Sequence, residues 1–166
     1  MSIAIYPGSF DPVTLGHLNI IKRASQCFEK VIVCVMINSN KQGMFTPQER
    51  VDLLKRSTER FGNVEVDFSD ELLAAYAKRR KAHVVVKGLR AVSDFEQEVQ
   101  MAVINRKLNP RLETMFLASS EKYTYLSSTI VKEMARYGAD LSDFIPREIV
   151  DDVNARMKQL LERKGN

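Results

Sequence analysis

Cysteine and histidine are both scarce in this sequence of 166 residues, which contains two of each. Neither Cys27 nor Cys34 has a second cysteine at the Cys-x-x-Cys spacing, so the sequence favours neither a disulfide framework nor a zinc site. Cys27 falls in a helical pattern and Cys34 in an apolar strand pattern. We therefore predict that both are reduced thiols of the core.

Long apolar runs and long charged runs are also missing. No apolar run approaches the length that spans a membrane, and the N-terminal residues lack the charged and then apolar pattern of a signal segment. The densest basic run, residues 78–81, is shorter than a nucleic-acid-binding arm. The net charge of +4 suits a phosphate-rich small ligand or a weak nucleic-acid surface. The default expectation is a cytoplasmic protein.

The pattern of apolar residues predicts an α/β fold. With 45% hydrophobic and 28% charged residues, the chain has the composition of a single globular domain, residues 1–166, with a real core. Strands are predicted at residues 3–6, 31–37, 64–68, 83–86 and 113–117, and helices at residues 15–28, 46–61, 72–81, 93–108, 127–137 and 146–164. This alternation indicates a Rossmann-like doubly wound sheet of five parallel strands with C-terminal helices, and ligands beyond the carboxyl ends of the strands.

Several residues are assigned structural roles. Residues 46–49 (Thr46-Pro47-Gln48-Glu49) have the pattern of a capping box with proline at the first helical position, and residues 93–96 also fit a helix cap. Met101 and Met115 lie in core patterns and are predicted to pack there. His83 merely precedes a strand, so we expect no chemistry from it.

The loop after the first strand, residues 6–17, carries the strongest functional signal. It contains glycines, prolines, hydroxyl groups and one of the two histidines. A helix start offers unpaired backbone N–H groups and the positive end of the helix dipole, which suits a phosphate. Gly16 lets a ligand approach the backbone closely, and His17 can donate a hydrogen bond or carry positive charge. The loop therefore suggests nucleotide handling, although His17 could also simply cap or pack.

Three other strand-end loops bring cations and hydroxyl groups to the same edge of the predicted sheet. The groups are Lys41 after the second strand, Lys87 and Arg90 around Gly88 after the fourth, and residues 127–129 (Ser-Ser-Thr) at a helix start after the fifth. Taken alone, Lys41 fits a solvated lysine, Gly88 a turn glycine, and residues 127–129 an ordinary helix cap. Taken together, they predict a polyphosphate site.

These loops offer no plausible carboxylate pair, metal cluster or Ser-His-Asp arrangement. The sequence has no Walker A loop, and the first loop does not match G-x-G-x-x-G. We therefore expect positioning and charge stabilisation, as in most transfer at phosphorus, in preference to covalent or metal-ligand catalysis.

Four blocks of the sequence stand in the order and at the spacing of a known family. They are residues 6–12 (Tyr-Pro-Gly-Ser-Phe-Asp-Pro), 14–17 (Thr-Leu-Gly-His), 87–96 (Lys-Gly-Leu-Arg-Ala, then Asp-Phe-Glu) and 127–133 (Ser-Ser-Thr-Ile-Val-Lys-Glu). Together they resemble the bacterial phosphopantetheine adenylyltransferases, which belong to the nucleotidyltransferases marked by a T/H-x-G-H motif. The motif alone is a superfamily signal, but the resemblance runs over nearly the whole chain.

The resemblance implies a reaction in which ATP and 4′-phosphopantetheine give dephospho-coenzyme A and pyrophosphate, with Mg²⁺. The acceptor phosphate, already ionised, would attack the α-phosphorus in line without a general base, and His17 would stabilise the α-phosphate. The implied ATP contacts are Ser9, Phe10, His17, Gly88, Leu89, Arg90, Glu98, Tyr123, Thr124, Tyr125, Leu126, Ser127, Ser128 and Thr129. The implied phosphopantetheine contacts are Ser9, Lys41, Leu73 and Lys87. Mg²⁺ would be held largely by ATP oxygens and water, so no protein ligand is expected.

The resemblance also implies a homohexamer, feedback binding of coenzyme A, and no nucleic-acid or membrane partner. Three positions depart from the family pattern. Ser9 stands where threonine is frequent and keeps the hydroxyl group. Lys87 stands where arginine is frequent, and it keeps the charge but loses the fork for bidentate phosphate binding. Lys132 also replaces a frequent arginine, which weakens the case for a direct role.

Two alternatives remain open from the sequence. A related T-x-G-H nucleotidyltransferase would act on nicotinate mononucleotide or transfer a cytidylyl group. A non-catalytic nucleotide- or RNA-binding module is motivated by the positive charge. It predicts that RNA affinity falls steeply with salt and that replacement of His17 causes no loss of function.

Overall fold

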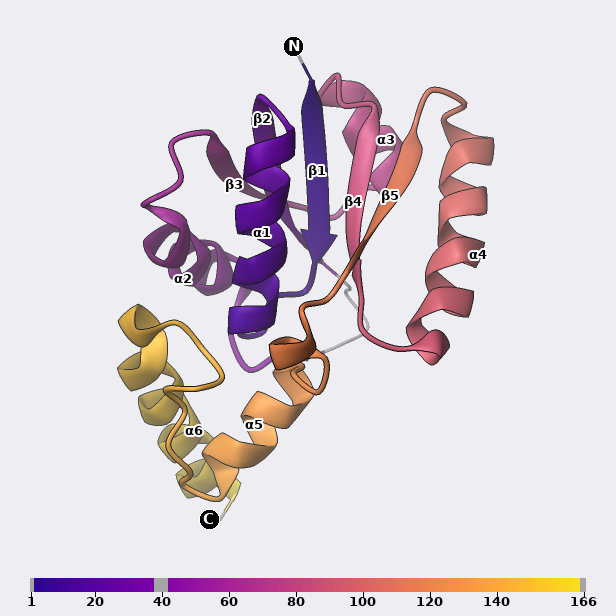
Figure 1. The fold of residues 1–166 in the computed structure, drawn as a ribbon. Helices are drawn as coiled ribbons and strands as arrows, with labels where there is room; N and C mark the ends of the chain where they lie inside the picture. Colours follow the sequence, from indigo (N-terminus) through magenta and orange to yellow (C-terminus); the bar gives the residue numbers. More distant parts are fainter. Residues whose placement is uncertain (1, 38–41, 165–166) are drawn as a thin grey trace.

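The structure is a computed structural model that describes residues 2–37 and 42–164 (Figure 1). Within these residues, five parallel strands form a sheet in the order β3-β2-β1-β4-β5. The strands are β1 Ile3–Gly8, β2 Lys30–Met36, β3 Val64–Ser69, β4 Val84–Leu89 and β5 Glu113–Ala118. The chain runs outward from β1 to β3 and returns on the other side of β1, so a topological switch point lies between β1 and β4. The predicted Rossmann-like doubly wound sheet is confirmed.

Helices cover both faces of the sheet. They are α1 Leu15–Cys27, α2 Pro47–Thr58, α3 Leu73–Arg79, α4 Val92–Leu108, α5 Ser128–Arg136 and α6 Val150–Lys164, with 3₁₀ turns η1 at Glu121–Tyr123 and η2 at Arg147–Ile149. Ala4 and Tyr6 of β1 belong to an apolar cluster with α1, α2, α5 and α6, whereas Ile5 belongs to a second cluster with α3. Neighbouring side chains therefore enter opposite clusters, as in a strand that is buried on both faces.

The chain after β5 lies at the edge of the sheet formed by the carboxyl ends of the strands (Figure 1). In Figure 1 the chain leaves β5 through η1 and enters α5 below the sheet, with α6 beside α5. The backbone N–H of Leu15 donates to the carbonyl of Phe144 (2.9 Å), so the first turn of α1 is tied to the segment between α5 and α6. The starts of α1 and α5 are thereby brought to the same edge of the sheet.

Helix caps agree with the sequence at α2 and differ from it at α4. Thr46 Oγ1 accepts the N–H of Glu49 (3.2 Å), and the Glu49 carboxylate accepts the N–H of Thr46 (2.8 Å), so the predicted capping box is confirmed. The N-cap of α4 is Ala91, so the predicted cap at residues 93–96 is wrong. The Asp94 carboxylate, inside the first turn, instead accepts the N–H of Arg90 (3.2 Å), which precedes the helix.

Strands β1 and β4 are longer than predicted. β1 extends through Pro7 to Gly8 and β4 through Lys87 and Gly88 to Leu89, because the strand pairing continues after the apolar runs end. Gly88 therefore lies inside a strand, and its interpretation as a turn glycine is wrong. A Cβ atom at Gly88 would lie 3.1 Å from Cγ1 of Ile20, so this glycine lets α1 pack closely on β4.

Three residues that were assigned to the core are exposed. Met101 on α4 and Met115 on β5 are 45% and 46% exposed, and Cys27 at the end of α1 is exposed as well, whereas Cys34 is buried as predicted. Apolar residues surround α4, but only part of its circumference contacts the sheet and α3, so the apolar pattern overstated its burial. No helix within the described ranges combines the length and the hydropathy of a bilayer-spanning segment.

Candidate active site

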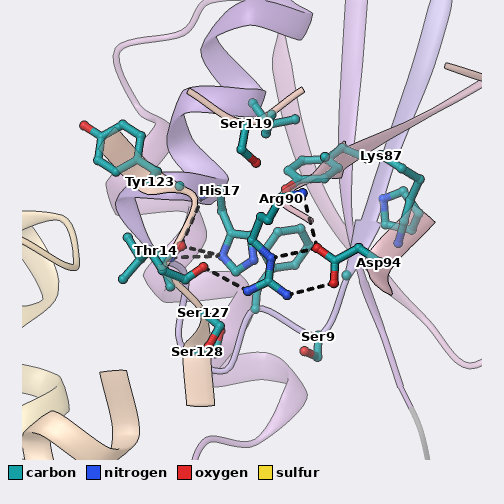
Figure 2. A pocket seen from close by; sticks show the side chains of 18 of the residues that line it. Ser9, Thr14, His17, Lys87, Arg90, Asp94, Ser119, Tyr123, Ser127 and Ser128 are labelled. Carbon is teal, nitrogen blue, oxygen red and sulfur yellow. Dashed lines mark hydrogen bonds and ion pairs between the residues drawn. The ribbon is translucent and has the colours of Figure 1, made fainter. Parts of the chain in front are cut away.

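A cavity of about 340 Å³ opens at the switch point between β1 and β4 (Figure 2). Its lining comes from the end of β1 and the loop after it, the first turns of α1 and α4, the end of β4, the segment between β5 and α5, and the start of α5. These segments are far apart in the sequence. They meet because parallel strands place their carboxyl ends at one edge of the sheet, as the sequence predicted.

His17 is held by the N-terminal cap of α1 (Figure 2). Its Nδ1 atom accepts the backbone N–H of Thr14 (3.0 Å), while Thr14 Oγ1 accepts the backbone N–H of His17 (3.2 Å). These two bonds form a capping box in which an imidazole replaces the usual Glu or Gln. Because a backbone N–H can only donate, Nδ1 is unprotonated, and the neutral ring carries its proton on Nε2.

Two aromatic rings hold the imidazole from the side. The ring centroid of Phe10 lies 4.9 Å from that of His17, and the ring centroid of Tyr6 lies 6.4 Å from it, both in edge-to-face geometry. Tyr6 and Phe10 are themselves in contact, at 5.4 Å, and both are buried. The contacts restrict the rotation of the imidazole and surround it with apolar groups.

The surroundings of His17 keep the ring neutral. Burial lowers its pKa from 6.5 to about 4, with the positive charges of Arg90 and Lys87 acting in the same direction. Of the two states that the sequence allowed, the neutral hydrogen-bond donor is therefore favoured over the positively charged imidazole. Burial also raises the pKa of the Tyr6 hydroxyl well above its usual range, so this neighbour is uncharged too.

The first turns of α4 supply an acidic partner for each cation at the end of β4. Arg90 donates from Nε and Nη2 to the Asp94 carboxylate (3.1 and 3.3 Å), and from Nη1 to the carbonyl of Leu126 (3.0 Å). The Nζ atom of Lys87 lies 3.1 Å from Oε1 of Glu98. Asp94 and Glu98 are four residues apart and therefore share one face of the helix. The cations are thus held in place by α4 and by the segment before α5.

The hydroxyl groups at the start of α5 have two different tasks. Ser127 caps the helix by accepting the N–H of Ile130 (3.2 Å), which confirms the capping interpretation. Ser128 donates from Oγ to the carbonyl of Pro12 (2.7 Å), which ties α5 to the loop after β1. Both serines and Thr129 line the cavity, so a second helix N-terminus borders the same space as that of α1.

The cavity brings together most of the residues that the sequence analysis selected. They are Ser9, Phe10, His17, Lys87, Gly88, Arg90, Glu98, Tyr123, Leu126, Ser127, Ser128 and Thr129. Leu89, Thr124 and Tyr125 belong to the same segments but do not line the cavity. The ring of Tyr125 instead contacts that of Phe144, with centroids 6.4 Å apart.

Of the other selected residues, Leu73 lies away from the cavity and Lys41 is not described. Leu73 begins α3 and packs against the apolar cluster on the other face of the sheet. Lys41 lies outside the described residues. Asp94, by contrast, was expected in a helix cap and in a family block but not in the site, whereas it is the carboxylate partner of Arg90. The spacing of four residues between the two was the available signal.

Comparison with known proteins shows the family of this chain. Residues 5–134 match the model of the cytidylyltransferase-like family. Over 159 residues, which are 96% of this chain and 99% of the relative, the sequence is 53% identical to the phosphopantetheine adenylyltransferase of Caldanaerobacter subterraneus subsp. tengcongensis. The chain belongs to the phosphopantetheine adenylyltransferase family. The resemblance noted in the sequence is therefore confirmed.

Another member of this family, the phosphopantetheine adenylyltransferase of Alkaliphilus metalliredigens, is 51% identical over 156 residues, or 94% of this chain and 99% of the relative. Among solved structures, a Vibrio parahaemolyticus protein described as a nicotinate-nucleotide adenylyltransferase matches with a TM-score of 0.72. That match covers 92% of this chain and 99% of the other, at 20% identity. At this identity the likeness concerns the fold alone.

We expect the imidazole of His17 to become protonated only as the pH falls towards 4, because burial and two neighbouring cations disfavour the charged ring. An NMR titration of the two histidine Cε1–H signals, assigned with His83→Gln, measures this pKa. A midpoint at or above 6.5 for His17 would contradict the neutral donor. In the unfolded chain the ring takes up a proton below about 6.5, so this group lowers stability as the pH falls from 6.5 to 4.

Proposed function

We propose that this protein transfers the adenylyl group of ATP to 4′-phosphopantetheine and releases dephospho-coenzyme A and pyrophosphate. The observation that carries the proposal is the identity of 46–53% over nearly the whole chain to proteins named phosphopantetheine adenylyltransferase. The cavity supports it, because a neutral hydrogen-bond donor, two cations and two helix N-termini border one space. Residues 1–166 would act as a single nucleotidyltransferase domain.

In this proposal His17 stabilises the α-phosphate. Its Nε2–H donates to a nonbridging oxygen of the α-phosphate as negative charge develops there during in-line attack. The ring does not act as a base, because Nδ1 already accepts the N–H of Thr14. No base is required, since the phosphate of the acceptor is ionised at neutral pH. A donor fixed beforehand by a helix cap and two aromatic rings needs no reorganisation in the transition state.

The remaining cavity residues are proposed to hold the nucleotide. The guanidinium of Arg90 would donate two hydrogen bonds to the phosphate oxygens. These oxygens would compete with the Asp94 carboxylate, which accepts the same N–H groups. Residues 127–129 would bind the outer phosphates through their hydroxyl groups and the N–H groups of the first turn of α5. The segment 88–90, Glu98 and residues 123–126 would contact the rest of ATP, together with Ser9 and Phe10.

The acceptor is proposed to contact Ser9, Lys41, Leu73 and Lys87. Ser9 and Lys87 line the cavity, so they would hold the acceptor phosphate within reach of the α-phosphorus. Leu73, at the start of α3, would contact the pantetheine chain from beyond the cavity. The assignment of Lys41 stays a prediction, because this lysine lies outside the described residues.

Mg²⁺ is proposed to bind as a complex with ATP. Among the described residues, no group of three or more His, Cys, Asp or Glu side chains could hold a metal ion, and the cavity carboxylates Asp94 and Glu98 are both ion-paired. These residues do not fit a protein-built magnesium site. The ion would bind phosphate oxygens and water, which is common for Mg²⁺ with nucleotides, and would offset the charge of the phosphates.

We further propose that the chain is a cytoplasmic homohexamer and that coenzyme A binds the same cavity as a feedback inhibitor. Coenzyme A carries the same adenylyl and pantetheine groups as the proposed product.

Support for the assembly comes from the exposed apolar residues of α4, here called the α4 surface, which are between 43% and 81% exposed: Val92, Phe95, Met101, Val103, Ile104 and Leu108. Exposed large apolar side chains that gather on one helix are a feature of interaction sites.

Pyrophosphate release tests the proposed acceptor. With ATP and Mg²⁺, we expect turnover with 4′-phosphopantetheine and none with nicotinate mononucleotide; exchange of ATP for CTP should also abolish turnover. Each acceptor is supplied at the same concentration, and a reaction without acceptor gives the background. Turnover with nicotinate mononucleotide alone would assign the protein to the related nucleotidyltransferases instead. RNA affinity that falls steeply with salt, together with no turnover, would favour a non-catalytic RNA-binding module.

Replacement of His17 tests the proposed stabilisation of the α-phosphate. His17→Ala should lower kcat about 10²- to 10³-fold, as loss of one preorganised oxyanion donor does, with a much smaller change in ATP affinity. Steady-state kinetics and calorimetric ATP titration measure the two quantities. His83→Ala, at the other histidine, is the matched control and should keep the wild-type kcat. An active His17→Ala variant would rule out the assigned role.

The α4 surface should control the assembly. Light scattering after gel filtration should give the wild-type protein a mass six times that of one chain. Val103→Asp should shift the protein to smaller species, because a charge would be buried at the apolar contact. Leu161→Asp changes an exposed apolar residue of α6 in the same way and should leave the mass unchanged. A monomeric wild-type protein would refute the proposed hexamer.

A further inference from the structure

Asp11 is a buried carboxylate next to the cavity that the proposed reaction does not use. Its side chain is almost fully enclosed, with the residue 5% exposed, and it does not line the cavity. Its oxygens accept the backbone N–H groups of Met44 (2.8 Å) and Phe45 (2.9 Å). The Nε atom of Arg50 lies 3.4 Å from Oδ1, and the Nζ atom of Lys132 lies 3.3 Å from Oδ2. One carboxylate thus has partners on three other segments.

Arg50 strengthens the same junction from α2. It is buried, and it donates to the carbonyl groups of Phe45 (2.8 Å) and Ser9 (3.4 Å) as well as pairing with Asp11. The backbone of Gly43 lies against this ion pair, so that a Cβ atom there would overlap the Arg50 guanidinium and lie 3.0 Å from the Asp11 carboxylate. The glycine is needed at this position because the ion pair leaves no room for a side chain.

The joined segments each border the proposed reaction. Ser9 and Phe10, directly before Asp11, line the cavity. Lys132 lies on α5, one turn after the cavity residues 127–129. Residues 42–45 directly follow position 41, which is a proposed contact of the acceptor. The junction therefore ties the loop after β1, which carries residues assigned to ATP and to the acceptor, to residues 44–45 and to the start of α5.

From these contacts we infer that Asp11 is a positioning residue for adenylyl transfer, an inference that rests on the proposed function. Its carboxylate fixes the loop after β1, the start of α5 and residues 42–45 relative to one another, and so aligns the acceptor phosphate with the α-phosphorus. Hydrogen bonds to an ionised carboxylate are stronger than neutral ones, which suits a junction that must be rigid. An asparagine in its place would accept only one of the two N–H groups and would leave Arg50 without a charged partner.

The effect of loosening this junction should fall on the chemical step. In-line transfer depends on the alignment of two bound reactants, and a displacement of about 1 Å can cost about 10²-fold in rate. Asp11 touches neither reactant in the proposed arrangement, so the affinity for each substrate should change much less. This separates positioning from direct binding.

Kinetics of Asp11→Asn test the inference. We expect kcat to fall about 10²-fold while the KM values for ATP and phosphopantetheine change less than about threefold. Hydrogen exchange at the amides of Met44 and Phe45 should accelerate in the same variant. The control is Asp67→Asn on β3, away from the cavity. This change removes a carboxylate that accepts hydrogen bonds from Tyr76 (2.8 Å) and Arg80 (2.5 Å). It should lower the melting temperature without changing kcat.

A second pair of variants keeps the inference testable if Asp11→Asn does not fold. Lys132→Met removes one cation from Asp11 and should lower kcat severalfold, whereas Lys132→Arg should restore it. The inference is overturned if Asp11→Asn has a lower melting temperature but the kcat of the wild type. If Asp11→Asn does not fold, the same result for Lys132→Met overturns it. A wild-type enzyme without turnover would instead overturn the proposed function, so the two failures are distinguishable.

Discussion

One hydrogen bond, from the backbone N–H of Thr14 to Nδ1 of His17, connects the fold of this chain to its chemistry. It satisfies an N–H group at the start of α1, the helix that packs Leu18 and Ile21 into the core. It also fixes the tautomer, because a ring protonated on Nδ1 could not accept this bond. A protonated imidazole would therefore weaken the helix cap as well as meet the repulsion of Arg90. The form of His17 that completes the helix is the same form that donates into the cavity.

The cations of the cavity are also stabilised by the fold. Arg90 and Lys87 approach His17 closely enough to depress its pKa, yet each is paired with a carboxylate of α4. A half-buried cation without a partner would be costly, since desolvation is not compensated. Asp94 and Glu98 supply that compensation before a nucleotide arrives, and phosphate oxygens can then take over part of it. The helix N-termini of α1 and α5 add positive potential without any further titratable group.

The sequence predicts those parts of the molecule that depend on local patterns. Buried strands such as β2, the capping box at Thr46 and the convergence of strand-end loops all follow from residue type and spacing. The ends of β1 and β4 do not, because strand residues that border a cavity need not be apolar. Met101 looks like a core residue because periodicity cannot tell which apolar side of α4 has a partner. The ion pairs of Asp11 with Arg50 and Lys132 and the neutral state of His17 depend on tertiary neighbours and burial, which a sequence alone does not supply.

The fold by itself does not choose the acceptor. A similar fold, at a TM-score of 0.72 and 20% identity, occurs in a protein described as a nicotinate-nucleotide adenylyltransferase, and function is set by the side chains of a site and not by the fold. In this chain the residues proposed for ATP come mainly from α1, β4, α4 and α5, whereas Leu73, proposed for the acceptor, begins α3 beyond the cavity. Asp11 does not line the cavity, and in the proposed arrangement it binds neither substrate. Its task, keeping two reactants in line, is the same for any acceptor phosphate, so the alignment can stay constant while the acceptor contacts differ.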